Sequence, residues 1–516
     1  MGKGFNTAFN ASLGIGFATM SLGVLSLTLV AASYVSSYIT EESTAKDYSD
    51  ICLYLAGYAL GASIVGLFAR VGGSIFAKAA DVGVDLTKVE ESEKNPGVVA
   101  DYIGDNVGEA IGISSELFAA FSEIICVTMI LSCDAPEILA APGTIYFPVI
   151  IFSSGIVISM VSVLIITKKN PKSTKEMEEN LNVQPLSAAL WMTPILLILC
   201  TYLLPSQIQL TGEDYIITSF KLTIVALFGL WGGYLIGKAS ESFTSHEYNN
   251  IDELARNCHT GSATDIIYGL ALGYMSTILP IVVLIVVIYT AYIFASMYGI
   301  AIAACGMFCT LSVLISVASY TSIANNAIGL SKMSDISYVS IRAEDIHAAG
   351  RTISAHVKCV EIGGAAIIAL AIFGAFIMRL ELSVVDLLRP IEFAGLIVGA
   401  MIPYLFSSQI LQVICKSKGI LKKEIERQMS AGKSSSQPDY HKCIRLCVSA
   451  SLKGMATPCS VAIFTPLVAG LFFGPVSICG LLAGIIVAGV QIGTAAVSSG
   501  TAWESAVKYI EGMVLL

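Results

Sequence analysis

KAADVGVDL at residues 78–86 and NPGVVADYIGDNVGE at residues 95–109 are the stretches that decide the fold. Each places acidic side chains four residues apart beside or within a long apolar segment, and that spacing lines them along one helical face. These carboxylates belong to Asp81, Asp85, Asp101, Asp105 and Glu109. An Asp at the centre of a helix in lipid costs about 2.5–3.5 kcal/mol, so such rows need water, cations or basic partners beside them. The pattern predicts a cation-loaded, anion-binding site at the mouth of a helix bundle.

The composition is that of an integral membrane protein. Hydrophobic residues make up 55% of the chain and charged residues 13%, whereas soluble domains carry about 25% charge. The mean hydropathy is +0.77. Apolar segments of about 20 residues, enough to cross a bilayer, recur along the whole chain. We expect twelve spans, at residues 11–36, 51–87, 98–132, 145–167, 186–205, 217–238, 261–292, 297–331, 354–379, 388–415, 443–471 and 475–502. The fold class is therefore all-α and polytopic, with residues 1–516 forming a single membrane-embedded domain.

The distribution of Lys and Arg predicts the orientation. The connections after even-numbered spans hold nearly all of these residues, including Lys168, Lys169, Lys172, Lys175, Arg256, Arg342, Lys416, Lys418, Lys422 and Lys423. Positively charged connections stay in the cytoplasm. We therefore expect both termini and the two carboxylate rows on the cytoplasmic side.

The chemistry of the site follows from its ligand types. The short connection VEESEKNPGV (89–98) makes spans two and three an antiparallel hairpin, which brings both acidic rows to one surface. Oxygen ligands without His or Cys suit a hard cation, and Mg²⁺ commonly bridges carboxylates to substrate phosphates. Arg70 and Lys78 precede the first row, which favours a phosphate-like anion. The alternative is a solvated acidic connection that happens to keep a period of four.

Two further features lie on the third span. Gly104, Gly108 and Gly112 form a strip of small residues that allows a close approach between helices. Glu116 and Glu123 lie deeper in the span, seven residues apart. Carboxylates inside a membrane are candidates for an ion path, and a structural role beside a polar neighbour is the alternative.

The two opening stretches resemble the signature of membrane-bound inorganic pyrophosphatases, ion pumps driven by pyrophosphate hydrolysis. The resemblance continues at SFTSHEYNNIDELARNCHTGSATDIIYGLALGY (242–274), QPDYHKCIRLCVSASLKGMATP (437–458) and GVQIGTAAVSSGTAWESAVKYIE (489–511). It implies a helical homodimer with two concentric rings of helices per subunit. It also implies that Mg-pyrophosphate is hydrolysed on the cytoplasmic side and that hydrolysis drives ion translocation, expected to be of protons.

The resemblance also implies roles for individual residues. Asp105 and Glu109 are expected to be catalytic, with Glu109 standing where the family has an Asp that helps to activate the attacking water. The expected Mg²⁺ ligands are Asp81, Asp85, Asp101, Asp105 and Glu504, where Asp101 is added from the acidic row itself. The expected substrate-binding residues are Arg70, Lys78, Lys358 and Lys508, and the expected ion-gate residues are Glu116 and Glu123.

The sequence departs from the family pattern at several of these motifs. ASYTSIANNAIG (318–329) stands where the family has DAYGPISDNAGG, so Ala318 and Asn325 replace acids. His347 and Arg351 replace the Asp and Asn of a second motif, and Val507 replaces a substrate Lys. From the resemblance we also expect the chain to lack the family's first helices and its last helix. Three readings follow: an active pump, an inactive or regulatory homologue that pairs with an intact paralogue, and an incomplete gene product.

The expected partners are inorganic pyrophosphate, the lipid bilayer, and a second subunit in a homodimer or in a heterodimer with a paralogue. No nucleic-acid partner is expected. The membrane would be that of a vacuole-like acidic compartment in a eukaryote and the plasma membrane in a prokaryote.

Overall fold

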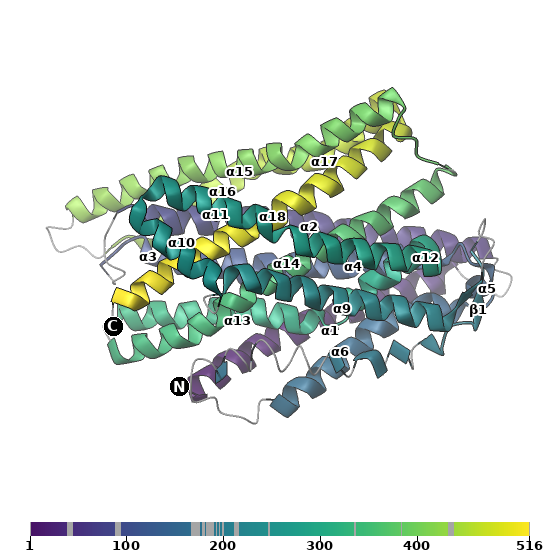
Figure 1. The fold of residues 1–516 in the computed structure, drawn as a ribbon, viewed down its shortest axis with the longest axis horizontal. Coiled ribbons are helices and arrows are strands. Elements are labelled where there is room, and N and C mark those ends of the chain that lie inside the picture. The colour runs from purple at the N-terminus through teal and green to yellow at the C-terminus, as the bar shows by residue number, and fades with distance from the viewer. Residues whose placement is uncertain are drawn as a thin grey trace.

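The computed structural model is an elongated bundle of helices (Figure 1). It describes residues 2–38, 45–87, 94–166, 201–210, 216–245, 248–334, 337–382, 384–431 and 438–514, with short pieces between 176 and 198. Within these residues, a two-stranded sheet, with Gln207 opposite Thr218 and Ile208 opposite Ile217, is the only sheet. The predicted all-α class is confirmed.

The described helices and strands follow one another along the chain in a fixed order. They are α1 (Gly2–Tyr38), α2 (Ala45–Asp85), α3 (Val98–Asp105), η1 (Asn106–Ile111), α4 (Gly112–Ser132), α5 (Pro136–Leu139), η2 (Pro142–Tyr146), α6 (Phe147–Ile166), β1 (Gln207–Ile208), β2 (Ile217–Thr218), α9 (Ser219–Thr244), α10 (Asn249–Thr260), α11 (Ser262–Ser276), α12 (Ile278–Phe308), α13 (Leu311–Met333), α14 (Ser337–Arg379), α15 (Pro390–Ala431), α16 (Tyr440–Gly454), α17 (Ala456–Phe473) and α18 (Pro475–Val514).

The helices match the predicted spans closely. Among the described residues, 11 helical segments are long and apolar enough to cross a membrane. The predicted span 186–205 lies largely outside the described residues. Residues 261–292 and 297–331 were expected as separate spans, and the structure breaks this region at Ala295 and Ser296, whose backbone angles are not helical. The expected multi-pass helical bundle is therefore present.

Helix α12 folds back on itself at this break. Gly229 of α9 lies against the Ala303 carbonyl, while Gly232, one turn further, lies against Val287. In a straight helix, residues 287 and 303 would be ~24 Å apart, at 1.5 Å per residue. Both reach the same turn of α9 only because the two halves of α12 lie side by side. The connection between them is therefore very short.

Helices α2 and α4 form the predicted hairpin, and glycine allows their close approach. A Cβ on Gly104 would lie 2.8 Å from the Ala77 Cα, and one on Gly108 would lie 2.9 Å from the Ala77 Cβ. Larger side chains at these positions would push α2 away from α3 and η1. The glycine strip therefore brings the two acidic rows together.

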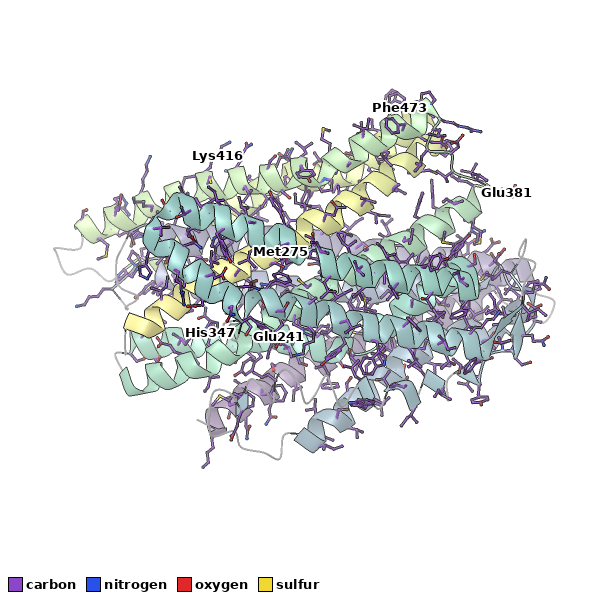
Figure 2. All side chains as sticks on the ribbon, viewed as in Figure 1. Glu241, Met275, His347, Glu381, Lys416 and Phe473 are labelled. Atoms are coloured by element: carbon purple, nitrogen blue, oxygen red, sulfur yellow. The ribbon has the colours of Figure 1, made fainter. Side chains whose placement is uncertain are left out.

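The helices divide into buried and exposed sets. In the most apolar 18-residue stretch of α13, 67% of the residues are buried. In the corresponding stretches of α15 and of the α16–α17 segment, only 11% are buried. Large apolar side chains such as Leu388, Leu471 and Phe472 are exposed, as a lipid-facing surface requires. Both chain termini lie at the same end of the bundle as α3 (Figure 1). In Figure 2, Glu381 and Phe473 mark the opposite end.

Replacing Gly104 with Ala tests the close approach of α2 and α3. We expect the added methyl group to lower the free energy of unfolding by about 1–3 kcal/mol, because it overlaps the Ala77 backbone. The measurement is thermal unfolding of the purified chain in detergent. Gly14→Ala is the matched control, since nothing lies within 4 Å of a Cβ at Gly14. Equal midpoints for the two variants would contradict the packing argument.

Candidate functional site

The first acidic row ends α2. Asp85 is the last residue of this helix, and Asp81 accepts a hydrogen bond from the Lys78 ammonium at 2.8 Å, one turn before it. Asp101 lies in the first turn of α3, on the other arm of the hairpin. Both rows therefore lie at one end of the bundle, as expected from the short connection.

The second row is not a single α-helical face, which corrects the expectation from spacing. Asp105 ends α3, and Glu109 lies in the π-helical segment η1. A π-helical turn contains an extra residue, which rotates the following side chains relative to an α-helix, and such turns are frequent at functional sites. The Arg70 guanidinium donates to the Gly108 carbonyl of this turn at 2.9 Å. Glu109 consequently points towards α14 as well as α2.

One ion pair connects the hairpin to α14, and a second joins the two arms of the hairpin. The Lys358 ammonium of α14 lies 3.0 Å from Glu109 Oε1, with side chains only 22% and 27% exposed. The Arg70 Nε of α2 lies 2.9 Å from Glu116 Oε2 on α4. These pairs bring the predicted substrate-binding cations Arg70 and Lys358 into contact with the predicted catalytic and gate acids.

Helix α13 supplies the polar partners of the Asp105 turn. The Asn325 amide donates to Asp105 Oδ2, and the Ser322 hydroxyl donates to the Asp105 carbonyl at 3.2 Å. Asn106 and Asn326 exchange amide hydrogen bonds at 3.0 and 2.9 Å. Asn325, which stands where the family motif has an acid, thus holds the Asp105 carboxylate instead of adding a second one.

The predicted site residues form one electrostatic network. Asp81, Lys78 and Glu109 all lie within electrostatic reach of the Asp105 carboxylate. Glu504 of α18 lies within reach of Lys78. The side chains of Lys508 and Arg351, two residues singled out from the sequence, lie outside the described part of the structure. Positive and negative groups therefore converge where α2, η1, α13, α14 and α18 meet.

Glu123 lies two turns beyond Glu116 on α4. The Ser63 hydroxyl of α2 donates a hydrogen bond to its Oε1 atom. Among the described residues Glu123 has no ion-pair partner, so the Ser63 hydroxyl supplies its polar contact. The gate acids expected from the sequence thus line the α2–α4 contact at successive depths.

The site has the donors that a magnesium phosphate complex needs. Its side chains offer oxygen ligands, which Mg²⁺ prefers. In the described part of the chain, no three His, Cys, Asp or Glu side chains converge as a ready-made metal cage. Mg²⁺ is usually held by one or two carboxylates together with substrate phosphates, so the arrangement fits a cation that binds along with its anion.

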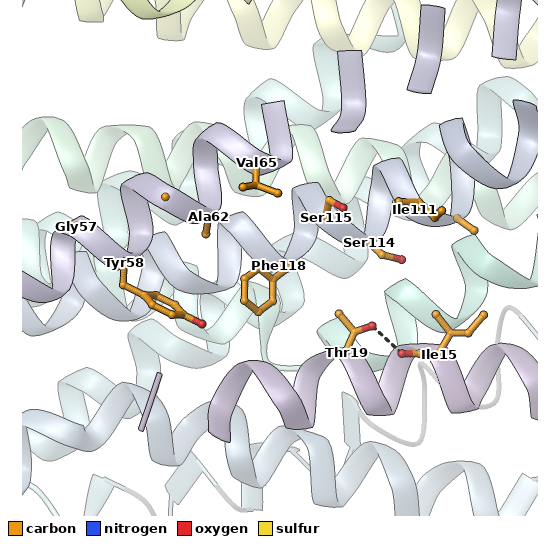
Figure 3. Close-up of a pocket in the computed structure, with 12 residues that line it drawn as sticks. Ile15, Thr19, Gly57, Tyr58, Ala62, Val65, Ile111, Ser114, Ser115 and Phe118 are labelled. Atoms are coloured by element: carbon orange, nitrogen blue, oxygen red, sulfur yellow. Dashed lines mark hydrogen bonds between the residues drawn. The ribbon is translucent and has the colours of Figure 1, made fainter. Parts of the chain in front are cut away.

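A cavity of about 740 Å³ lies between α1, α2 and the η1–α4 segment. Figure 3 shows Thr19, Tyr58, Ser114 and Phe118 on its wall. Its lining contains no charged residue. The cavity therefore does not suit a phosphate, and the charged network next to it remains the candidate site.

Sequence reasoning did not identify Ser322, Asn326 or Glu361. Glu361 is buried in α14, one turn after Lys358. A signal was present for two of them, because tandem Asn residues and a single acid inside an apolar span are unusual. The sequence offers no such signal for Ser322. The contacts of all three residues lie on other helices, which spacing within one segment does not predict.

Comparisons with known proteins agree with the geometry. The family model described as inorganic H⁺ pyrophosphatase matches residues 1–515. The chain is 30% identical over 531 residues to the K⁺-insensitive pyrophosphate-energised proton pump of Methanosarcina mazei, covering 99% of this chain and 74% of the relative. It is 30% identical over 510 residues to the K⁺-stimulated pyrophosphate-energised sodium pump of Thermotoga maritima, covering 90% and 69%. It is 30% identical over 550 residues to the pyrophosphate-energised membrane proton pump 3 of Arabidopsis thaliana, covering 98% and 68%.

Replacing Lys358 with Ala tests the Lys358–Glu109 pair. We expect the free energy of unfolding to fall by about 1–3 kcal/mol, because a largely buried carboxylate loses its partner. Adding Glu109→Gln should recover part of this loss, which thermal unfolding of the two variants measures. Lys422→Ala is the control, since its pair with Glu426 is longer, at 3.7 Å, and more exposed. Strictly additive effects of the two substitutions would contradict the pairing.

Proposed function

The chain belongs to the inorganic H⁺ pyrophosphatase family, and from that membership we propose that it hydrolyses Mg-pyrophosphate and couples hydrolysis to ion translocation. Members of this family couple pyrophosphate hydrolysis to ion pumping. The observation that carries the proposal for this chain is the convergence of Lys78, Arg70 and Lys358 with Asp81, Asp105 and Glu109.

The basic residues bind the substrate phosphates. Pyrophosphate carries several negative charges, and Lys78 lies at the exposed end of the network with a side chain 58% exposed. Lys358 lies deeper, on Glu109. An ammonium group binds phosphate as a point charge. Lys508 is proposed as a further substrate residue from the family motif.

Asp105 and Glu109 orient the attacking water. A carboxylate within hydrogen-bond distance of water accepts its proton as a general base. Glu109 is held by Lys358, and Asp105 is held by Asn325. When a phosphate group draws Lys358 away from Glu109, an oxygen of this carboxylate becomes available to the water.

Mg²⁺ would be held by carboxylates from Asp81, Asp85, Asp101, Asp105 and Glu504. When bound, it neutralises charge on the phosphate oxygens. The protein's own contribution is to place these oxygens on two antiparallel arms and on α18, facing the cations that hold the rest of the anion.

The proposed direction of transport is inferred from the Lys and Arg distribution and from the positions of the expected gate acids. The Lys and Arg distribution supports a site that faces the cytoplasm. Glu116 and Glu123 continue from the site into the bundle and form the proposed ion path, expected to carry protons. The family resemblance supports a homodimer or a heterodimer with an intact paralogue.

Phosphate release from Mg-pyrophosphate by the purified chain in lipid tests the proposal. We expect Asp81→Ala with Asp105→Ala to lower the rate at least 100-fold, since loss of one preorganised group alone costs about 10²–10³. Glu426→Ala is the control, because this acid lies on α15 with a side chain 54% exposed, outside the network.

Other outcomes of this assay separate the alternatives. Release that drives acidification of vesicles establishes a pump. Absence of release together with stabilisation by pyrophosphate would instead identify a binding or partner subunit. Absence of both signals would leave an incomplete or inactive homologue.

Asn325→Asp tests the cation site independently of turnover. This substitution sets a second carboxylate against Asp105, which destabilises the turn without a cation and favours Mg²⁺ binding. We expect Mg²⁺ to raise the unfolding midpoint of the variant more than that of the original chain. Asn326→Asp is the control, because its partner Asn106 is neutral. An equal Mg²⁺ response in all three proteins would rule out a cation site at Asp105.

A further inference from the structure

Glu361 is an acid inside the bundle whose role neither the sequence motifs nor the proposed hydrolysis explains. It lies on α14, within the segment Ile353–Arg379 that is apolar enough to span a membrane. The residue is 6% exposed, and its Oε1 atom has no hydrogen-bond partner among the residues that the structure describes. A buried carboxyl oxygen without a partner is costly, so it requires an explanation.

The neighbour of Glu361 is an acid of the proposed ion path. The Glu361 carboxyl group lies within hydrogen-bonding contact of the Glu116 carboxyl group on α4. Glu116 also lies against Arg70, at 2.9 Å. Two carboxyl groups hydrogen-bond to each other only when one of them carries a proton, because a carboxylate has no donor.

The charges around this contact lead to the same conclusion. The groups within electrostatic reach of Glu361 are Arg70, Lys358 and Glu116. Lys358 is paired with Glu109, and Arg70 is paired with Glu116 and the Gly108 carbonyl. Each cation therefore serves one carboxylate, and Glu361 is left without a cation. A third full negative charge here would be strongly unfavourable in a membrane interior.

We propose that Glu116 and Glu361 form a carboxyl pair that shares one proton inside the bundle, making Glu361 a further member of the ion path. The pair lies beyond the Lys358–Glu109 contact, since Glu361 is one turn further along α14 and Glu116 seven residues further along the η1–α4 segment. Arg70 contacts both the η1 turn and this pair. Movement of Arg70 towards a phosphate would remove the cation beside Glu116 and favour proton binding by the pair. The return of Arg70 would favour release of the proton.

The pair adds two proton-accepting carboxyl groups to the proposed ion path, between the candidate site and Glu123. Glu123, two helical turns beyond Glu116, is the next acid along α4 and is held by Ser63. A proton leaving the pair in that direction meets this carboxylate. The inference deepens the proposed ion translocation, but the shared proton itself exists whether or not the chain hydrolyses pyrophosphate.

Infrared spectroscopy of the chain in lipid at neutral pH tests the pair. A protonated carboxyl group gives a C=O stretch that is separate from carboxylate bands and shifts in heavy water. We expect this band in the original chain and a loss of band intensity in Glu361→Gln, where the amide donates to the Glu116 carboxyl group. Glu116→Gln should also remove the band, because Glu361 then ionises beside Arg70.

Glu241→Gln is the matched control. Glu241 is a buried acid on α9 whose Oε2 atom lies 2.8 Å from the Lys238 ammonium, so it has a cation beside it, unlike Glu361. Its replacement should leave the band unchanged. An unchanged band in Glu361→Gln would overturn the proposal. Loss of the band when sodium chloride replaces potassium chloride would also overturn it and would identify a sodium site. Because the readout requires no turnover, an inactive chain that keeps the band would refute the hydrolysis proposal alone.

Discussion

Pairing of buried charges is the constraint on which the rest of this structure depends. In a bundle surrounded by lipid, a carboxylate or an ammonium is tolerated only beside an opposite charge, a hydrogen-bond donor or water. Lys358 with Glu109 and Arg70 with Glu116 meet this requirement. The first pair joins α14 to η1, 249 residues away in sequence, and the second joins the two arms of the α2–α4 hairpin. The charges of the candidate site therefore also stabilise the way in which α2, α4 and α14 meet.

Small residues make these pairs geometrically possible. Gly104 and Gly108 bring α2 against α3 and η1, so that short side chains such as Asp105 reach the same space as residues of α2. The π-helical turn at Asn106–Ile111 then turns Glu109 towards α14. Close packing and the irregular turn therefore act together: one sets the distance between the helices, and the other sets the direction of the acid.

The structure explains what one departure from the family motifs does. Asn325 holds the Asp105 carboxylate with its amide, where an acid would repel it in the absence of a cation. Glu361 places another carboxyl group beside Glu116, and among the described residues its Oε1 atom has no hydrogen-bond partner. Both residues belong to the network of helices that holds Asp105, Glu109 and Glu116.

The sequence by itself determined the membrane class, most of the spans, the hairpin with its glycine strip, and most of the charged residues that converge in the candidate site. These features repeat at short spacings, so local periodicity and composition are enough to find them. Only the tertiary structure decided which groups face one another: Asn325 with Asp105, which lie 220 residues apart, and Glu361 with Glu116. It also decided the π-helical turn and the fold-back of α12. Partners on different helices are selected by packing and by the cost of a buried unpaired charge, and neither is written in the spacing of a single segment.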